Sequence, residues 1–281
     1  MGEGKDGFFW EYMEIPQKND DNALEMYTLQ CRNHILKPLA EKYGIDTSDD
    51  AIRAAVEQHN EVCRLIRAIG DFRKEANPRV TGYEFHILTL VSYVAPKHLI
   101  VDKLRETLEE IKTREPDAAD KYRARVVFVG SEVDDVDVIR LVEESGAYVC
   151  ADRFCYGSLP GRDEILLNDD EDVVKQVCRQ VQGRAQCPRY WDMAKMTGRR
   201  DYVADLAKEY GADGIIYEQM KFCDPWAYER MIGTIVLRDE HGYPVLAVDR
   251  PYSIGSSGQM RTRVQAFVES IEIKKIQGGK K

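Results

Sequence analysis

The stretch that decides the fold is Gly214-Ile215-Ile216-Tyr217-Glu218-Gln219-Met220-Lys221-Phe222-Cys223-Asp224-Pro225. Its first four residues have the length and composition of a buried strand, and a polar turn with one cysteine follows. Asp224 is a candidate N-cap and Pro225 suits a first helical turn, so we expect a helix to begin there. Cys223 would then lie between a strand end and a helix start, where the helix dipole and free amide groups favour the thiolate that binds metals or attacks electrophiles.

Alternating strands and helices surround this stretch, over residues 121–281. Short and continuously apolar runs predict four strands, at 125–130, 148–152, 214–217 and 244–249, and the intervening patterns predict helices at 134–145, 170–181, 201–210, 228–235 and 260–273. Short buried strands joined by helices are typical of a doubly wound parallel α/β domain, here with about four strands. Ligands bind such sheets off the carboxyl ends of the strands, so we expect 130–132, 152–155, 219–224 and 249–259 to share one edge.

The preceding residues, 20–120, predict a mostly helical domain. Apolar residues recur at helical spacing between Ile52 and Ile69, with Ser48 as the candidate N-cap, and two further helices are expected at 81–94 and 98–111. An earlier helical run, which ends near Gly44, contains Pro38, which should bend or break it.

Residues 1–19 are expected to form a tail and a short strand. Residues 1–7 are glycine-rich and charged, which indicates a flexible tail, and residues 8–16 form an aromatic extended segment stopped by proline. We expect this strand to have no partner nearby in the sequence.

The bulk composition of the 281 residues is that of an ordinary soluble protein, with 32% charged residues and a mean hydropathy of -0.47. No apolar run approaches the length of a bilayer span, and the N-terminus lacks a signal-peptide pattern, so the cytoplasm is the expected location and no membrane partner is expected. A net charge of -9 argues against nucleic-acid binding. The seven cysteines indicate free thiols or metal ligation rather than a disulfide framework.

Three cysteines are candidates for a site at the carboxyl edge. Cys223 is a candidate metal ligand or nucleophile, and a thiol simply packed beneath the helix start is an equally good interpretation. Cys155 and Cys187 can reach the same edge, although loop residues without a role are the alternative. No Cys-x-x-Cys spacing occurs, so any cluster site must be assembled from distant segments. The cysteines expected in apolar helix faces are Cys31, Cys63 and Cys178.

The segment 253–259 runs into the last expected helix. Ser256, Ser257, Gly258 and Gln259 are candidates for an anion-binding loop whose free amide groups face a phosphate or carbonyl oxygen. The alternative is a plain flexible connection, because the segment matches neither the Walker pattern nor the dinucleotide fingerprint. The sequence shows no recognisable Ser/His/Asp or paired-His arrangement, so catalytic residues stay unassigned.

Three motifs together resemble one family. The motifs are Lys221–Pro225, Gly258–Arg263 with Gln265–Phe267, and Asp152–Gly157. They resemble the subunits of 2-hydroxyacyl-CoA dehydratases and of the related ATP-dependent benzoyl-CoA reductases. Glu14–Pro16 and Val80–Gly82 resemble the middle portion of the same family, so the resemblance covers nearly the whole chain.

The resemblance implies a 4Fe-4S cluster held by cysteines from two α/β domains of each subunit. Cys223 matches the ligand from the C-terminal domain, and this chain is expected to be a C-terminal portion that begins after the other α/β domain. A cluster would then need Cys155, Cys187 or a separate chain to complete its ligands. The helix start near Gln259 would face the substrate or the cluster.

The resemblance also implies a reaction. An ATP-hydrolysing activator protein would deliver a low-potential electron through the cluster to an acyl-CoA substrate, with a homologous partner subunit present. In the dehydratases, which are lyases, a ketyl radical then permits loss of water; in the benzoyl-CoA reductases, which are oxidoreductases, the electron enters an aromatic ring. We expect the dehydratase type. The alternatives are the reductase type, a non-catalytic partner or scaffold subunit without its own cluster, and a thiol protein that uses Cys223 alone.

Overall fold

The computed structural model describes residues 2–3, 9–116, 121–184, 186–190, 193–252 and 257–278. Its centre is an all-parallel sheet with the strand order β4-β3-β5-β6. The strands are β3 Ala124–Gly130, β4 Ala147–Arg153, β5 Gly214–Met220 and β6 Val245–Arg250. All four predicted strands are therefore confirmed.

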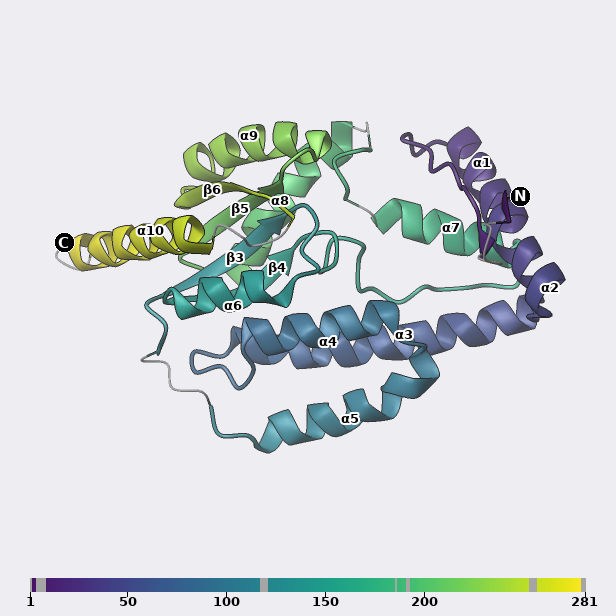
Figure 1. Cartoon of the computed structure of the whole chain (residues 1–281), viewed down its shortest axis with the longest axis horizontal. Coiled ribbons are helices and arrows are strands. Elements are labelled where there is room, and N and C mark those ends of the chain that lie inside the picture. The colour runs from purple at the N-terminus through teal and green to yellow at the C-terminus, as the bar shows by residue number, and fades with distance from the viewer. Residues whose placement is uncertain are drawn as a thin grey trace.

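Helices cover both faces of this sheet (Figure 1). On one face, α6 (Val136–Glu144) and α10 (Ser257–Gly278) pack apolar side chains such as Ile139 and Phe267 onto β3 and β4. On the other face, α8 (Met193–Glu209) packs on β3 and β4, and α9 (Asp224–Asp239) packs on β5 and β6. Because its strands are buried on both sides, the sheet reads in sequence as continuous apolar runs, and the doubly wound α/β fold is confirmed.

The strand order reverses between β3 and β5. The chain passes from β3 through α6 to β4 on one side, and later places β5 and then β6 on the other side of β3. In open α/β sheets, such a switch point leaves a crevice at the carboxyl ends of the two strands, where ligands bind. Here the switch point lies at the ends of β3 and β5.

Three long helices form a layer beside the sheet: α3 (Asp49–Asp71), α4 (Gly82–Val94) and α5 (Lys97–Thr113). They share an apolar core of their own, and the short η2 (Phe72–Lys74) follows α3. Ser48 caps α3, as predicted, and Thr81 with Glu84 forms a capping box on α4.

A carboxylate of the α/β unit binds the first turn of α4 and so attaches the helical layer to the sheet. Glu143 of α6 accepts hydrogen bonds from the first backbone amides of α4, at Gly82 and Tyr83, over 2.9 and 3.1 Å. Burial raises the pKa of Glu143 to about 7. The helical and α/β segments thus pack closely, and their division into domains at residue 120 stays a prediction.

The first helices lie at the other end of the helical layer (Figure 1). α1 (Asp21–Cys31) passes through the π-helical turn η1 (Arg32–Leu36) into α2 (Lys37–Tyr43). The turn ends shortly before Pro38, which lacks an amide hydrogen. The helix continues through Pro38, so the predicted break is absent and the predicted bend stays a prediction. α1 packs through Leu24 against α7 (Val173–Arg184).

One expectation for the N-terminus is wrong. The strand β2 (Phe9–Trp10) has a partner close in sequence, because it pairs antiparallel with β1 (Gly2–Glu3). A two-residue ladder depends on backbone hydrogen bonds alone, and its short polar strand carries no apolar pattern that sequence reasoning could detect.

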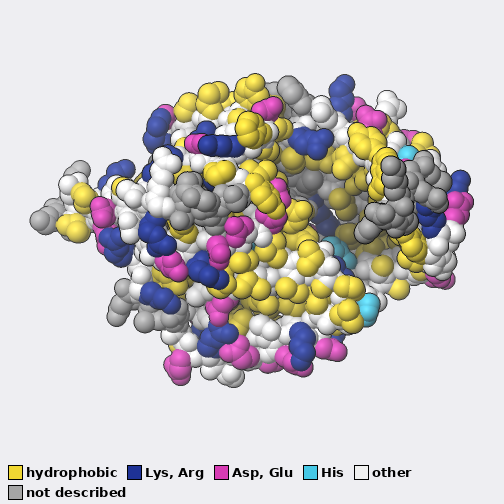
Figure 2. All heavy atoms as spheres, viewed as in Figure 1, with side chains coloured by type: hydrophobic (Ala, Val, Ile, Leu, Met, Phe, Trp, Pro, Cys, Tyr) yellow, Lys and Arg dark blue, Asp and Glu magenta, His cyan; other side chains and the backbone are white. Residues whose placement is uncertain are grey.

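The surface is hollowed on the face that Figure 2 shows, between the carboxyl ends of the strands and α7. Lys or Arg side chains lie deep inside this hollow (Figure 2). Among the described residues, none of the helices combines the length and apolarity that a membrane crossing requires.

Candidate functional site

A buried carboxylate lies at the switch point. Glu218 of β5 is fully buried, and Ser131, which follows β3, donates to its Oε2 from both the backbone amide and Oγ over 3.1 and 3.0 Å. Arg250 Nε lies 2.9 Å from the other oxygen, Oε1. Burial raises the pKa of Glu218 to about 7, although Arg250 opposes the rise. Sequence reasoning missed this residue, whose one signal is an acid inside an apolar strand.

The three candidate thiols gather near this switch point. Cys155, Cys187 and Cys223 all pack against the apolar cluster that contains Trp226, on the α8 and α9 face of the sheet. Burial raises the pKa of Cys155 to about 12, and Cys187 and Cys223 are close enough to add to the rise. The structure thus brings together segments that the sequence places up to 68 residues apart.

The expectation of a thiolate at Cys223 is wrong. Cys223 itself is the N-cap of α9, one residue before the predicted cap Asp224, which lies inside the helix. Burial raises the pKa of the Cys223 thiol, and the backbone amide of Trp226 at the helix start only partly offsets the rise. Desolvation therefore outweighs the helix dipole, and the neutral thiol is the favoured form.

The turn that carries Cys223 is strained. Phe222 has a φ of 72°, in the left-handed region that a bulky side chain rarely adopts, and it is 97% exposed. The Cys223 amide donates to Met220 O over 3.1 Å across this turn. Such strain persists only where the surrounding structure enforces it, and here it fixes the position of the thiol at the start of α9.

The thiols suit a metal cluster in kind but do not form a complete site. Thiolate sulfur is the ligand that iron–sulfur clusters use. However, no three His, Cys, Asp or Glu side chains in the described ranges are placed to hold a metal ion. A complete cluster site therefore needs ligands beyond the described residues.

The predicted loop before α10 lies at the end of β6. Ser256 falls outside the described residues, and Ser257 and Gly258 open the helix. Gln259 lines a small cavity of about 30 Å³ together with Asp249 and Arg263. Its role toward substrate stays a prediction.

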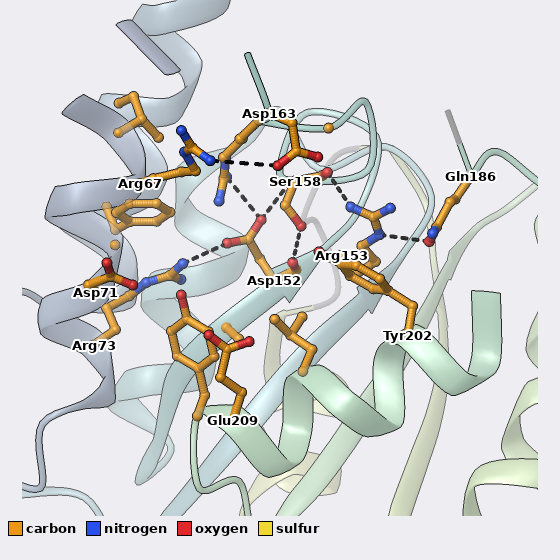
Figure 3. Close-up of a pocket in the computed structure, with 18 of the residues that line it drawn as sticks. Arg67, Asp71, Arg73, Asp152, Arg153, Ser158, Asp163, Gln186, Tyr202 and Glu209 are labelled. Carbon is orange, nitrogen blue, oxygen red and sulfur yellow. Dashed lines mark hydrogen bonds and ion pairs between the residues drawn. The ribbon is translucent and has the colours of Figure 1, made fainter. Parts of the chain in front are cut away.

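A larger cavity, of about 470 Å³, lies between α3 with η2, the end of β4 and α8 (Figure 3). We name it the arginine cavity, after the basic side chains in its wall: Arg67, Arg73, Lys74, Arg153, Arg162 and Arg184.

Asp152, at the end of β4, is the buried acid of the arginine cavity. Arg73 donates to its Oδ1 over 3.1 Å, and Arg162 and the Ser158 amide donate to its Oδ2 over 3.2 and 2.7 Å. Although burial opposes them, Arg162 and Arg73 hold the pKa of Asp152 well below its usual range. Sequence reasoning placed Asp152 at this edge but missed Arg73, which comes from the helical layer.

Comparison with known proteins identifies the family. The family model described as 2-hydroxyglutaryl-CoA dehydratase, D-component, matches residues 7–271. The chain belongs to this family. The resemblance inferred from the sequence motifs is therefore confirmed.

Curated relatives within the dehydratase family are similar at low identity. The beta subunit of (R)-phenyllactyl-CoA dehydratase from Clostridium sporogenes is 25% identical, over 92% of this chain and 67% of the relative. The beta subunit of (R)-2-hydroxyglutaryl-CoA dehydratase from Acidaminococcus fermentans is 24% identical, over 92% and 68%. A benzoyl-CoA reductase subunit from Thauera aromatica is 23% identical, over 95% and 68%. The chain spans about two thirds of the length of each of these relatives.

Proposed function

We propose that this chain is a subunit of a cytoplasmic, iron–sulfur acyl-CoA dehydratase of the 2-hydroxyacyl-CoA type. The observation that carries the proposal is the position of Cys223. In a chain of the dehydratase family, this thiol lies near the switch point, packed on the same apolar cluster as Cys155 and Cys187.

In this proposal, Cys223 supplies one thiolate to a 4Fe-4S cluster. Cys155, Cys187 or another polypeptide segment supplies the remaining ligands. When bound, such a cluster provides a low-potential electron carrier and a Lewis-acidic iron. The chain's own contribution is to hold Cys223 through the strained turn at Phe222 and to surround it with apolar side chains that exclude water.

The high thiol pKa of Cys155 and Cys223 has a consequence for assembly. A metal binds the thiolate, so each sulfur must lose a proton as the cluster binds. Because burial favours the neutral thiol, cluster insertion should be faster at alkaline pH than at neutral pH.

The partners follow from the same proposal. The substrate is an acyl-CoA, a homologous partner chain completes the enzyme, and an ATP-hydrolysing activator protein delivers the electron that forms a ketyl radical on the substrate. The names of the relatives, which describe subunits of acyl-CoA enzymes, support this assignment.

Two alternatives have an observation in their favour. A benzoyl-CoA reductase subunit is supported by the relative from Thauera aromatica. A non-catalytic partner subunit is supported by the lack of a three-ligand metal site among the described residues.

Turnover by the assembled enzyme tests the assignment. The chain, its partner subunit and the activator are combined without oxygen, with ATP and a reductant, and offered either a 2-hydroxyacyl-CoA or benzoyl-CoA. We expect an enoyl-CoA 18 mass units lighter than the hydroxy substrate, since one water is lost. A dienoyl-CoA from benzoyl-CoA would instead establish the reductase, and turnover by the other components without this chain would establish a non-catalytic subunit.

A further inference from the structure

The inner wall of the arginine cavity carries more positive than negative charge. Two guanidinium groups, of Arg73 and Arg162, bind the buried carboxylate of Asp152, and a third, of Arg153, lies in the same wall. His86 also lies close to Asp152, but burial lowers the pKa of His86 to about 4, so it adds no charge at neutral pH. Three cations against one anion leave a net charge of about +2 in a largely desolvated place.

Arg153 is the origin of this imbalance. It is only 4% exposed, and its Nε donates to Gln186 Oε1 over 3.2 Å while its Nη1 donates to the backbone oxygen of Ser158. Both acceptors are neutral. Among the residues that the structure describes, Arg153 forms an ion pair with no carboxylate, unlike Arg73 and Arg162. Burial accordingly lowers its pKa, which is the mark of a cation that lacks a counter-charge.

The other acids of the arginine cavity do not supply that counter-charge. Asp71 and Glu209 stand at the rim, where both bind Lys74, at 2.8 and 2.5 Å. Asp163, also largely exposed, faces Arg67 at 3.6 Å. In Figure 3, the rim acids Asp71, Asp163 and Glu209 lie around the inner group at Asp152. The three rim acids are thus paired with Lys74 and Arg67 and not with Arg153.

The arrangement is suited to a doubly charged anion. A guanidinium group binds phosphate or carboxylate through paired N–H donors, and buried charges are stable when they are paired. One carboxylate would leave one charge unbalanced, whereas a phosphate monoester or a diphosphate carries the two charges required. The volume of about 470 Å³ falls in the range of sites for small organic ligands and exceeds what inorganic phosphate fills.

An aromatic ring lies where the organic part of such a ligand would sit. The Arg153 guanidinium stacks on the ring of Tyr202, 4.1 Å from its centroid, and Tyr202 lines the arginine cavity from α8 (Figure 3). A planar base or a sugar can pack beside this ring, as aromatic side chains do in many ligand sites.

We propose that the arginine cavity is a binding site for an organic phosphate, with phosphoryl oxygens on Arg153 and Arg162 and the organic group beside Tyr202. The site needs no metal. Coenzyme A and adenosine diphosphate both carry the required diphosphate, and the choice of coenzyme A as a probe rests on the proposed function. The proposed site itself rests on the charges of the cavity.

Binding of three probes by calorimetry tests the proposal: pyrophosphate, adenosine diphosphate and coenzyme A. Arg153→Gln should weaken binding of the diphosphates by about tenfold or more, because it removes the uncompensated cation and its paired donors. Arg105→Gln is the matched control. It removes the same charge from an exposed position on α5, where Arg105 binds Asp102 at 2.6 Å, and should change affinity less than about twofold.

The outcomes separate the ligand sources and the two proposals. Tighter binding of coenzyme A than of adenosine diphosphate indicates an acyl-carrier site, and the reverse indicates a nucleotide effector. Equal binding by the wild type and Arg153→Gln, or no binding of any probe at millimolar concentration, overturns the proposal. If Arg153→Gln fails to fold, Arg162→Gln takes its place with the same expected loss. Because these assays need neither iron nor an activator, a failure of turnover leaves their result intact.

Discussion

Two buried carboxylates at the same edge of the sheet behave in opposite ways. Asp152 ends β4 in the arginine cavity, and Glu218 lies at the switch point beside the thiols. Both lie against a glycine, since a Cβ added to Gly157 or Gly130 would come within 2.4 Å of Asp152 Oδ2 or 2.6 Å of Glu218 Oε2. Yet the pKa of Asp152 is lowered and that of Glu218 is raised to about 7.

The number of guanidinium groups explains the difference. Asp152 binds two arginines, whose attraction exceeds the cost of burial, whereas Glu218 forms an ion pair with one arginine among the described residues, Arg250, and burial prevails. One region of the edge therefore holds charge and suits an anionic ligand. The other disfavours charge and surrounds soft sulfur atoms. Neighbouring strand ends thus offer two different chemistries.

The largest expected effect comes from removing the charge of Asp152. Asp152→Asn leaves Arg73 and Arg162 without their carboxylate, and breaking a buried ion pair in this way costs about 3–5 kcal/mol. Urea denaturation at neutral pH measures the loss. A cost below about 1 kcal/mol would mean that the arginines are solvated and that the cavity is not charge-rich.

The effect on stability of the matched change at the other carboxylate, Glu218→Gln, should depend on pH. The pKa of Glu218 is raised from 4.5 to about 7, so the folded state binds this proton more tightly than the unfolded chain. The associated stability is complete below pH 4.5 and is lost as the pH rises through 7, about 3 kcal/mol in all. Glu218→Gln should remove this loss of stability. Glu143, whose pKa is also about 7, should still cause a similar loss of stability in both proteins.

Unfolding free energies of the wild type and Glu218→Gln at pH 5 and pH 8 measure this difference. The unfolding free energy of Glu218→Gln minus that of the wild type should be about 2–3 kcal/mol larger at pH 8 than at pH 5. An equal difference in unfolding free energy at both pH values would show that Glu218 is ionised in the folded protein at pH 5 as well as at pH 8. The contribution of Asp152 has the opposite sign, because its lowered pKa gives stability above the unfolded value of 3.8 that is lost in more acidic solution.

Alanine at the two glycines should cost about 1–3 kcal/mol each, with the larger loss at Gly130. Its added Cβ would lie 2.4 Å from the backbone oxygen of Glu218, which only a shift of β5 can relieve. The corresponding atom at Gly157 first meets the side chain of Asp152. Thermal denaturation of the two variants shows which one loses more stability. A larger loss at Gly157 would mean that the tighter contact lies in the arginine cavity.

The smallest effect should come from Phe222. Phe222→Asn replaces an exposed, strained residue with one that tolerates the left-handed region, so stability should rise by about 1 kcal/mol or less. A higher melting temperature checks this expectation. A clear loss of stability would show that the Phe222 ring has a packing partner and that the turn is not strained.

Local patterns predicted most of the fold. The apolar runs around Phe128 and Ile216 revealed buried strands, and Ser48 marked the start of α3, because these signals lie within a few residues. The approach of Cys155 to Cys223 was also expected, since both follow strand ends of one parallel sheet.

The charges of the site were not predictable in this way. Arg73 contacts Asp152 across a sequence separation of 79 residues, and no local pattern in either segment predicts this ion pair. The pKa of Cys223 depends on the balance between burial and a helix start, and sequence shows only the second. Net charges and desolvation arise from packing between distant elements, so they required the structure.

The central claim, that Cys223 is a ligand of an iron–sulfur cluster, is tested most directly by iron and sulfide analysis. The chain is purified without oxygen, together with its partner subunit, as wild type, Cys223→Ser and the control Cys63→Ser, whose thiol is buried on α3 in the helical layer. The account predicts that the wild type and Cys63→Ser retain iron and sulfide in equal amounts and that Cys223→Ser loses the share bound by this chain. Equal iron and sulfide in all three proteins would contradict it.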